Sequence, residues 1–362
     1  MSASFAAWLA KRSVEQIEFA PGVATPRSFG DPAREHLATR RGGGLFDFSF
    51  MQCADIAGPR ALECVEVLQT RRLAGLAPGR IAYTLLLRDD GSVLNDATVW
   101  RLEPNRFRVL TGRRADHAII AAFAATFDIA IPPMAECAVI AIQGDISRRT
   151  IERALREIDI AALPYYGFCV ARFAGTDCSI ARLGYSGETG YEIVIAEAAA
   201  AALWEALLAA GAHAGLVECG FDAANSLRIE AGHILFTREL AAPVTPFELG
   251  LGRLVDFHGR DFVGASRLRQ SRWDGPERRL VGLLPAGEAP SGTQVPHELD
   301  EGTAAMTSDC FSPVFERRIG IGFAAARDAS PGSSVELVGG GRARVARLPF
   351  YDPPKALARR GR

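Results

Sequence analysis

The chain has 362 residues, more than one hydrophobic core usually organises, so two or three domains are expected. Hydrophobic residues make up 48% of it and charged residues 23%, a composition typical of globular proteins. Because 41 Lys and Arg residues balance 42 Asp and Glu residues, the charge argues against a nucleic-acid partner or a membrane-surface partner.

No segment approaches the ~18–20 uninterrupted apolar residues of a membrane span. The N-terminal sequence MSASFAAWLAKRSVEQ places its apolar residues before its basic ones, the reverse of a secretory signal, so we expect a cytoplasmic protein. The seven cysteines are odd in number, scattered, and without a CxxC pair. They predict reduced thiols, and no metal site is expected.

Residues 1–44 carry many Pro and Gly residues and are expected to be irregular. The first strand is predicted over LFDFSFMQCADIAG, and the sequence RALECVEVLQTRRL after it has helical spacing. The segment AECAVIAIQGDISRRTIERAL repeats this order of strand, Gly turn and helix. The two units predict an α+β protein with two related subdomains.

Between these units, AYTLLLRDDGSVLNDATVWRL predicts a hairpin that turns at Asp90 and Gly91. An Ala-rich helix ending at Gly211 follows, and then a helix over FDAANSLRIEAG. Polar sequence near residues 270–280 precedes short β-like runs rich in turn residues. We therefore predict a ligand-binding region over residues 1–274 and an all-β domain over residues 275–362.

Asp96 is the first candidate for chemistry, because it follows the hairpin turn and enters an apolar strand. Burial disfavours an ionised carboxylate and raises its pKa, which suits a group that takes up and releases protons. A carboxylate that faces solvent or caps the turn fits the same pattern.

The run RLGYSGETGYEIVI, residues 182–195, is the second candidate. A phosphate-binding loop needs a helix after its glycines and favours a Lys, whereas a strand follows here and no Lys is near. We interpret the glycines as a bend that presents Tyr185 and Glu192 to a flat ring with paired N–H donors. A hairpin with Tyr in the core and Glu on the rim is equally compatible.

The third candidate is Arg228 in SLRIEAGHILFTREL. Arg228 and Glu230 are two residues apart and cannot share a helix face, but Arg228 lies close to His233 around the helix end. A buried Arg beside a cleft can hold a carboxylate of a ligand. An Arg on a solvated helix face is the alternative.

Eight segments resemble, in order, those of the glycine cleavage T-protein (aminomethyltransferase) superfamily. They are LFDFSFM, GRIAYTLLLRDDGSVLND, IQGDISRRTIERAL, LGYSGETGYEIVI, SLRIEAG, LGRLVDFHGRDFVGASRL, TSDCFSPVFERRIGIGFA and LPFYDPP. The resemblance extends from about residue 45 to 355. It implies a three-domain, cloverleaf-like α+β fold, with tetrahydrofolate in a central channel and a C-terminal β-barrel-like domain.

The resemblance also implies roles for single residues. The acidic residue that lies beside the reactive folate nitrogens matches Asp96, which is the implied catalytic residue, and the carboxylate that grips the pterin matches Glu192. The other implied folate contacts are Tyr83, Asn95, Trp100, Tyr165, Tyr185 and His233. For the one-carbon donor we predict contacts from Phe50, Met51 and Arg228.

The sequence also departs from the family pattern. GLGARD is GFDAAN here, so Ala224 replaces a folate-contacting Arg, and Phe50 replaces a His. The segment with Asn95 before Asp96 is similar to that of folate-dependent demethylase relatives. We therefore predict a tetrahydrofolate-dependent transferase that moves a methyl or aminomethyl group from a small-molecule donor to folate N5. The alternatives are a non-catalytic folate-binding or regulatory homologue and a homologue that binds another ligand; the oligomeric state stays open.

Overall fold

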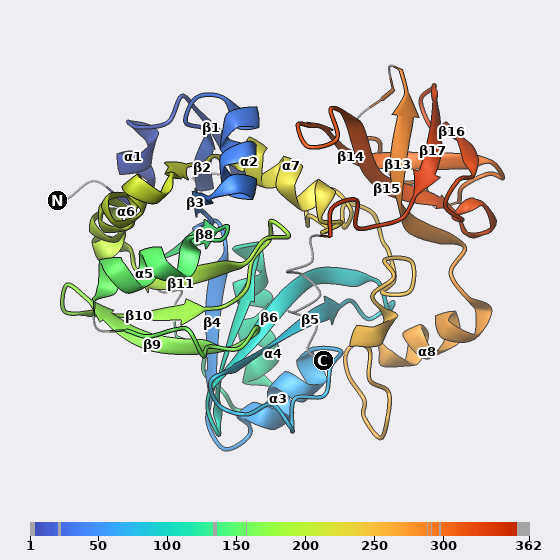
Figure 1. The fold of residues 1–362 in the computed structure, drawn as a ribbon. Helices are drawn as coiled ribbons and strands as arrows, with labels where there is room; N and C mark the ends of the chain where they lie inside the picture. The colour runs from blue at the N-terminus through green and yellow to red at the C-terminus, as the bar shows by residue number, and fades with distance from the viewer. Residues whose placement is uncertain are drawn as a thin grey trace.

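The computed structural model describes residues 4–352 except 21–22, 133–135, 157, 288, 291 and 297. Two sheet-based lobes and a barrel make up the chain, and helix α7 (Phe221–Glu230) lies between the first lobe and the barrel (Figure 1). This arrangement confirms the predicted α+β fold with a C-terminal β-barrel.

The first lobe contains a six-stranded sheet with α5 (Ser147–Leu155) and α6 (Glu197–Gly211) packed on one face (Figure 1). Alternate residues of its strands enter two different cores, because both faces of the sheet are buried. In spatial order the strands are β12 (Leu216–Glu218), β3 (Gly43–Asp47), β8 (Cys137–Gln143), β11 (Gly190–Ala196), β10 (Thr176–Ala181) and β9 (Phe168–Phe173).

The prediction that residues 1–44 are irregular is wrong. They contain α1 (Phe5–Ala10), the hairpin of β1 (Glu15–Ala20) and β2 (Val23–Ser28), and α2 (Pro32–Arg41). Proline does not break α2, because it occupies the first turn, where no backbone N–H is needed, behind an Asp cap.

The second lobe is an antiparallel four-stranded sheet with two helices, α3 (Ala61–Leu68) and α4 (Ala115–Ala125), packed against it. The strands, in spatial order, are β4 (Gln52–Ala57), β7 (Arg106–Thr111), β6 (Val93–Glu103) and β5 (Arg80–Leu87). Strands β5 and β6 form the hairpin predicted from the Asp-Gly turn.

The prediction of one strand over LFDFSFMQCADIAG is wrong, because β3 and β4 belong to different sheets. The chain turns between them, where the Asp47 carboxylate accepts a hydrogen bond from the Ser49 backbone N–H at 2.9 Å. This crossing carries Phe48, Phe50 and Met51 into the space between the two sheets. The position of these side chains therefore follows from the change of sheet.

After α8 (Ala265–Asp274), the chain forms a closed barrel with strand order β13-β15-β14-β16-β17. Its strands are β13 (Arg278–Ala286), β14 (Thr303–Ser312), β15 (Arg317–Ala325), β16 (Ser334–Leu337) and β17 (Arg342–Ala346). The division into 1–274 and 275–362 stays a prediction. Within the described ranges, no helix combines the length and the apolar character needed to cross a membrane.

Candidate active site

A cavity of about 1120 Å³ lies where the two sheet lobes meet the barrel. Its volume is slightly above the roughly 300–1,000 Å³ that is typical of small-molecule sites. Its wall carries nine aromatic rings and the carboxylates of Glu192, which is buried, and Asp96, which is half-buried. The aromatic side chains that line it are Phe48, Phe50, Tyr83, Tyr165, Tyr166, Tyr185, His233, Phe236 and Tyr351.

The β5–β6 hairpin sets the position of Asp96. Tyr83 pairs with Thr98 in this hairpin, and Asp96 is two residues from Thr98, so Tyr83 and Asp96 are diagonal neighbours on one face. The Tyr83 hydroxyl donates a hydrogen bond to Asp96 Oδ2 at 2.9 Å. Burial raises the pKa of Asp96 to about 6, although the hydrogen bond from Tyr83 acts in the opposite direction. Asp96 can therefore exchange a proton near neutral pH.

Glu192 lies in β11, on the opposite face from Tyr191, which packs in the core of the first lobe. Its side chain is buried, with 5% of the residue surface exposed. Burial raises the pKa of Glu192 to about 8, and no cation or donor among the described residues offsets this effect. A buried carboxylate without a partner is costly unless a ligand supplies donors to it. Glu192 is therefore the residue of this cavity most clearly prepared for a ligand.

The glycines of the GYSGETGYE segment serve close packing around Gln143. A side chain at Gly184 or Gly190 would collide with the Gln143 amide, and Gly187 has a φ of +83°, which favours glycine. The resulting loop directs Tyr185 into the cavity, where its ring stacks on His233 with centroids 5.6 Å apart. The Tyr185 hydroxyl donates to the Ile234 backbone carbonyl, which holds the ring in place.

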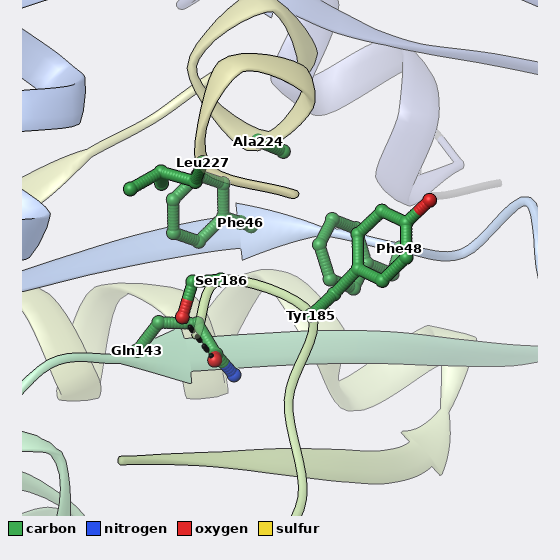
Figure 2. A pocket seen from close by; sticks show the side chains of 7 residues that line it. All are labelled: Phe46, Phe48, Gln143, Tyr185, Ser186, Ala224 and Leu227. Atoms are coloured by element: carbon green, nitrogen blue, oxygen red, sulfur yellow. Dashed lines mark hydrogen bonds between the residues drawn. The ribbon is translucent and has the colours of Figure 1, made fainter. Parts of the chain in front are cut away.

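A narrow crevice adjoins the cavity at Phe48 and Tyr185 and has no room for a water molecule. Figure 2 shows the Ser186 hydroxyl bonded to Gln143 Oε1 on one wall of the crevice, at 2.8 Å, and Ala224 on the opposite wall. Ala224 is not among the described residues that line the large cavity. The Arg that the family carries at this position would therefore start from the crevice and not from the cavity wall.

Eight of the residues predicted to bind a ligand or donor, or to act on it, line this cavity of about 1120 Å³. They come from the β3–β4 crossing, the β5–β6 hairpin, the loop before β9, the Gly-rich segment and the end of α7. They are Phe50, Met51, Tyr83, Asp96, Tyr165, Tyr185, Glu192 and His233.

The structure places two other predicted folate contacts away from the cavity. Trp100 is fully buried in β6 against Phe168, with ring centroids 5.1 Å apart, and its indole N–H donates to Thr98. Asn95 occupies the other face of β6 from Asp96, where its amide donates to the Asp116 carboxylate at 2.6 Å. The contacts of both side chains are with other protein groups, and these contacts explain why the sequence has Trp and Asn at the two positions.

Arg228 was predicted to hold the donor, but its guanidinium is fully buried between α7 and the barrel. It forms an ion pair with Glu239 at 2.9 Å and donates to the Ser308 hydroxyl of β14 at 2.7 Å. Its contact with His233 is to the backbone carbonyl, at 3.0 Å. These partners are all protein groups, and Arg228 joins α7 to the barrel.

Tyr166, Phe236, Arg253 and Tyr351 line the cavity although none of them was predicted to. Tyr166 adjoins Tyr165, with ring centroids 4.5 Å apart, and a doubled tyrosine before a strand could have suggested it. Tyr351 lies in the LPFYDPP segment, where nothing local indicates that the chain returns to the cavity. In the part of the chain that the structure describes, no cluster of three or more His, Cys, Asp or Glu side chains could hold a metal ion.

A family model, two relatives and one crystal structure indicate the same family for this chain. The model of the GCVT N-terminal domain family matches residues 5–259. The chain is 35% identical over 347 residues to an aminomethyltransferase of Streptomyces avermitilis, covering 92% of this chain and 93% of that protein. It is 30% identical over 342 residues to an aminomethyltransferase of Halothermothrix orenii, covering 92% and 95%. The crystal structure of the glycine cleavage system aminomethyltransferase T from Bartonella henselae superposes with a TM-score of 0.84 at 27% identity, covering 96% of each chain.

Proposed function

Because the chain belongs to the glycine cleavage T-protein family, we propose that it is a tetrahydrofolate-dependent transferase that moves a one-carbon group from a small donor to folate N5. The observation that supports this most directly is the unpartnered, buried Glu192 in an aromatic cavity of about 1120 Å³. A carboxylate accepts two parallel N–H donors, which is what the amino-pyrimidinone edge of a pterin presents. The tyrosines of the wall offer flat surfaces for the ring.

In this proposal Glu192 and the tyrosines bind the pterin, and Asp96 handles the proton. When bound, tetrahydrofolate would supply the N5 nitrogen that accepts the one-carbon group. Asp96 has a pKa of about 6 and is therefore mainly ionised at pH 7, ready to accept a proton or to orient an N–H. Tyr83 fixes the direction of the Asp96 carboxylate through its hydrogen bond of 2.9 Å. Holding both reactants in line supplies much of the rate enhancement.

An aminomethyl group is the transferred unit that the names of the relatives favour. Methyl transfer, as in folate-dependent demethylases, is a second candidate because the donor end of the cavity is apolar. Phe50 packs against Phe19, with ring centroids 4.5 Å apart, and near Phe236, at 6.2 Å. This aromatic cluster suits a small methylated donor.

A non-catalytic folate-binding homologue was the main alternative, and the replacement of the family Arg by Ala224 favoured it. Ala224 lies at the crevice of Figure 2, whereas the Asp96–Tyr83 pair at the cavity is complete. These positions favour an active transferase over a binding protein that has lost its catalytic group.

Titration with tetrahydrofolate, followed by turnover with candidate donors, tests the proposal. Formation of 5,10-methylenetetrahydrofolate from an aminomethyl donor and formation of 5-methyltetrahydrofolate from a methylated donor distinguish the two transferred groups. Asp96→Asn should lower kcat by about 100-fold or more while folate still binds. Asp89→Asn is the matched control, because Asp89 is an exposed carboxylate on the same hairpin. A wild-type protein that binds no reduced folate would refute the proposal.

A further inference from the structure

The segment that follows the barrel returns to the cavity and is anchored there by Tyr351. Leu348, Pro349, Tyr351 and Asp352 form part of the cavity wall. The Tyr351 backbone N–H donates to the Glu230 carbonyl, at the end of α7, at 2.8 Å. The side chain makes two further contacts, because its hydroxyl donates to Glu188 Oε1 at 2.9 Å and its ring lies 3.9 Å from the Arg40 guanidinium carbon.

Arg40, on α2, joins Tyr351 to two other parts of the molecule. Its guanidinium forms ion pairs with Glu230 at 2.7 Å and with Glu188 at 3.2 Å, and it donates to the Ser186 carbonyl at 2.8 Å. The side chains of Glu188 and Glu230 are fully buried, and that of Arg40 is 5% exposed. A buried arrangement of charges with this many fixed partners has little freedom to adopt another geometry.

The partners of this network include both ends of the bend that presents Tyr185. Ser186 and Glu188 flank Gly187, which itself lines the cavity, and the Glu188 N–H donates to the Ser186 hydroxyl at 3.1 Å. Tyr185 precedes Ser186 directly, so the backbone that Arg40 holds also sets where the Tyr185 ring lies. Tyr351 touches this network from the barrel side.

We propose that Tyr351 is a positioning residue for the ligand site: its hydroxyl and ring lock Glu188 and Arg40, which hold the 185–188 bend with Tyr185 directed at the ligand. This role rests on the proposed folate function. It assigns the segment after the barrel a part in forming the pterin site, although the predicted site residues all lie in the first 274 residues. In this proposal Asp96, and not Tyr351, takes part in the chemical step.

Tyr351→Phe tests this role, because it keeps the ring over Arg40 and removes only the hydroxyl that reaches Glu188. We expect the dissociation constant for tetrahydrofolate to rise roughly tenfold, which corresponds to a bend that holds the binding geometry about one-tenth of the time in the free protein. At saturating folate, kcat should stay within about twofold, because Tyr351 acts through binding geometry. Tyr191→Phe is the matched control, since Tyr191 is buried in the core of the first lobe and should leave folate binding unchanged.

Hydrogen exchange of the 182–190 segment in the ligand-free protein provides the second measurement. Tyr351→Phe should speed exchange there and leave exchange in the core strands unchanged, whereas a purely structural role would alter both or neither. If Tyr351→Phe does not fold, Glu188→Gln replaces it, because this change weakens the same contact from the other side. Wild-type folate affinity and unchanged exchange in either variant would overturn the role. If the wild-type protein binds no folate, the proposed function fails, and the exchange comparison still decides whether Tyr351 holds the bend.

Discussion

The Tyr83–Asp96 hydrogen bond sets the pH range in which Asp96 can act. Burial raises the pKa of Asp96 to about 6, and the Tyr83 hydroxyl keeps it from rising further. If the ionised form is required, kcat/KM rises with pH through about 6, and a second rise near pH 8 reports the ionisation of Glu192. Tyr83→Phe removes a donor to the carboxylate, so we expect the midpoint of the first rise to move up by about one pH unit. A kcat/KM profile from pH 5 to 8.5 measures the shift; an unchanged midpoint would mean that another group controls the rate.

Glu192 links ligand binding to a loss of stability. Burial raises its pKa to about 8 from an ordinary value of 4.5. Between these values the unfolded chain has released a proton that the folded chain keeps, so stability falls as pH rises through this window. Glu192→Gln removes this effect, and its Tm should exceed that of the wild type by several degrees at pH 8.5, with little difference near pH 4.5.

Bound folate should make the wild-type protein more stable than Glu192→Gln. The Glu192 carboxylate then accepts hydrogen bonds from the pterin, and the Gln amide cannot accept both of them. Thermal unfolding of both proteins at two pH values, with and without tetrahydrofolate, gives all four comparisons. A Glu192→Gln protein that is stabilised by folate as much as the wild type would remove Glu192 from the pterin site.

At the scale of elements, the Gly-rich segment is built around one buried amide. A methyl group at Gly190 would collide with Gln143 on the neighbouring strand β8, and the two residues pair directly in the sheet. Gly190→Ala should therefore destabilise the protein by about 1–3 kcal/mol through overpacking. Gly75→Ala is the control, because Gly75 is exposed and has open space around it. Denaturant unfolding measures both, and equal free energies of unfolding for the two variants would contradict this account.

Local pattern predicted the elements that lie within one sheet or one helix. The β5–β6 hairpin and the β8–α5 unit follow from turn residues and periodicity. The β3–β4 segment was misjudged because one apolar run continues while the chain passes from one sheet to another. Periodicity records which residues are buried, and both sides of this crossing are buried.

The same limit applies to the site residues. Asp96 and Glu192 could be proposed because an acidic residue in an apolar strand is costly wherever the strand lies. Trp100 occupies the same strand as Asp96, but Phe168 from a distant segment covers it. Tyr351 was missed for the converse reason, because its partners on α2 and in the Gly-rich loop are remote in sequence.

At the scale of the whole molecule, two buried ionic networks join the lobes around the cavity. Arg40 connects α2, the Gly-rich loop and the end of α7, and Arg228 connects α7 to the barrel. Glu239 accepts from the Leu235 N–H and from the hydroxyls of Thr307 and Ser308 as well as from Arg228. Both junctions lie between the first lobe and the barrel, so they hold together the two sides of the cavity wall that these parts supply.

Substitution of Arg228 therefore distinguishes a structural role of this residue from the predicted donor-binding role. Arg228→Met leaves the Glu239 carboxylate buried without its cation, and we expect a loss of about 3–5 kcal/mol in the free energy of unfolding. Replacing both partners by apolar side chains, Arg228→Met with Glu239→Leu, should recover part of this loss, because no uncompensated charge then remains. Since the hydrogen bonds of the Arg228 guanidinium go to groups inside the protein, KM for the donor should stay within about twofold of wild type in the folded double variant. Urea unfolding and steady-state kinetics on the same preparations measure both quantities, and a large rise in donor KM at unchanged stability would restore Arg228 to the donor site.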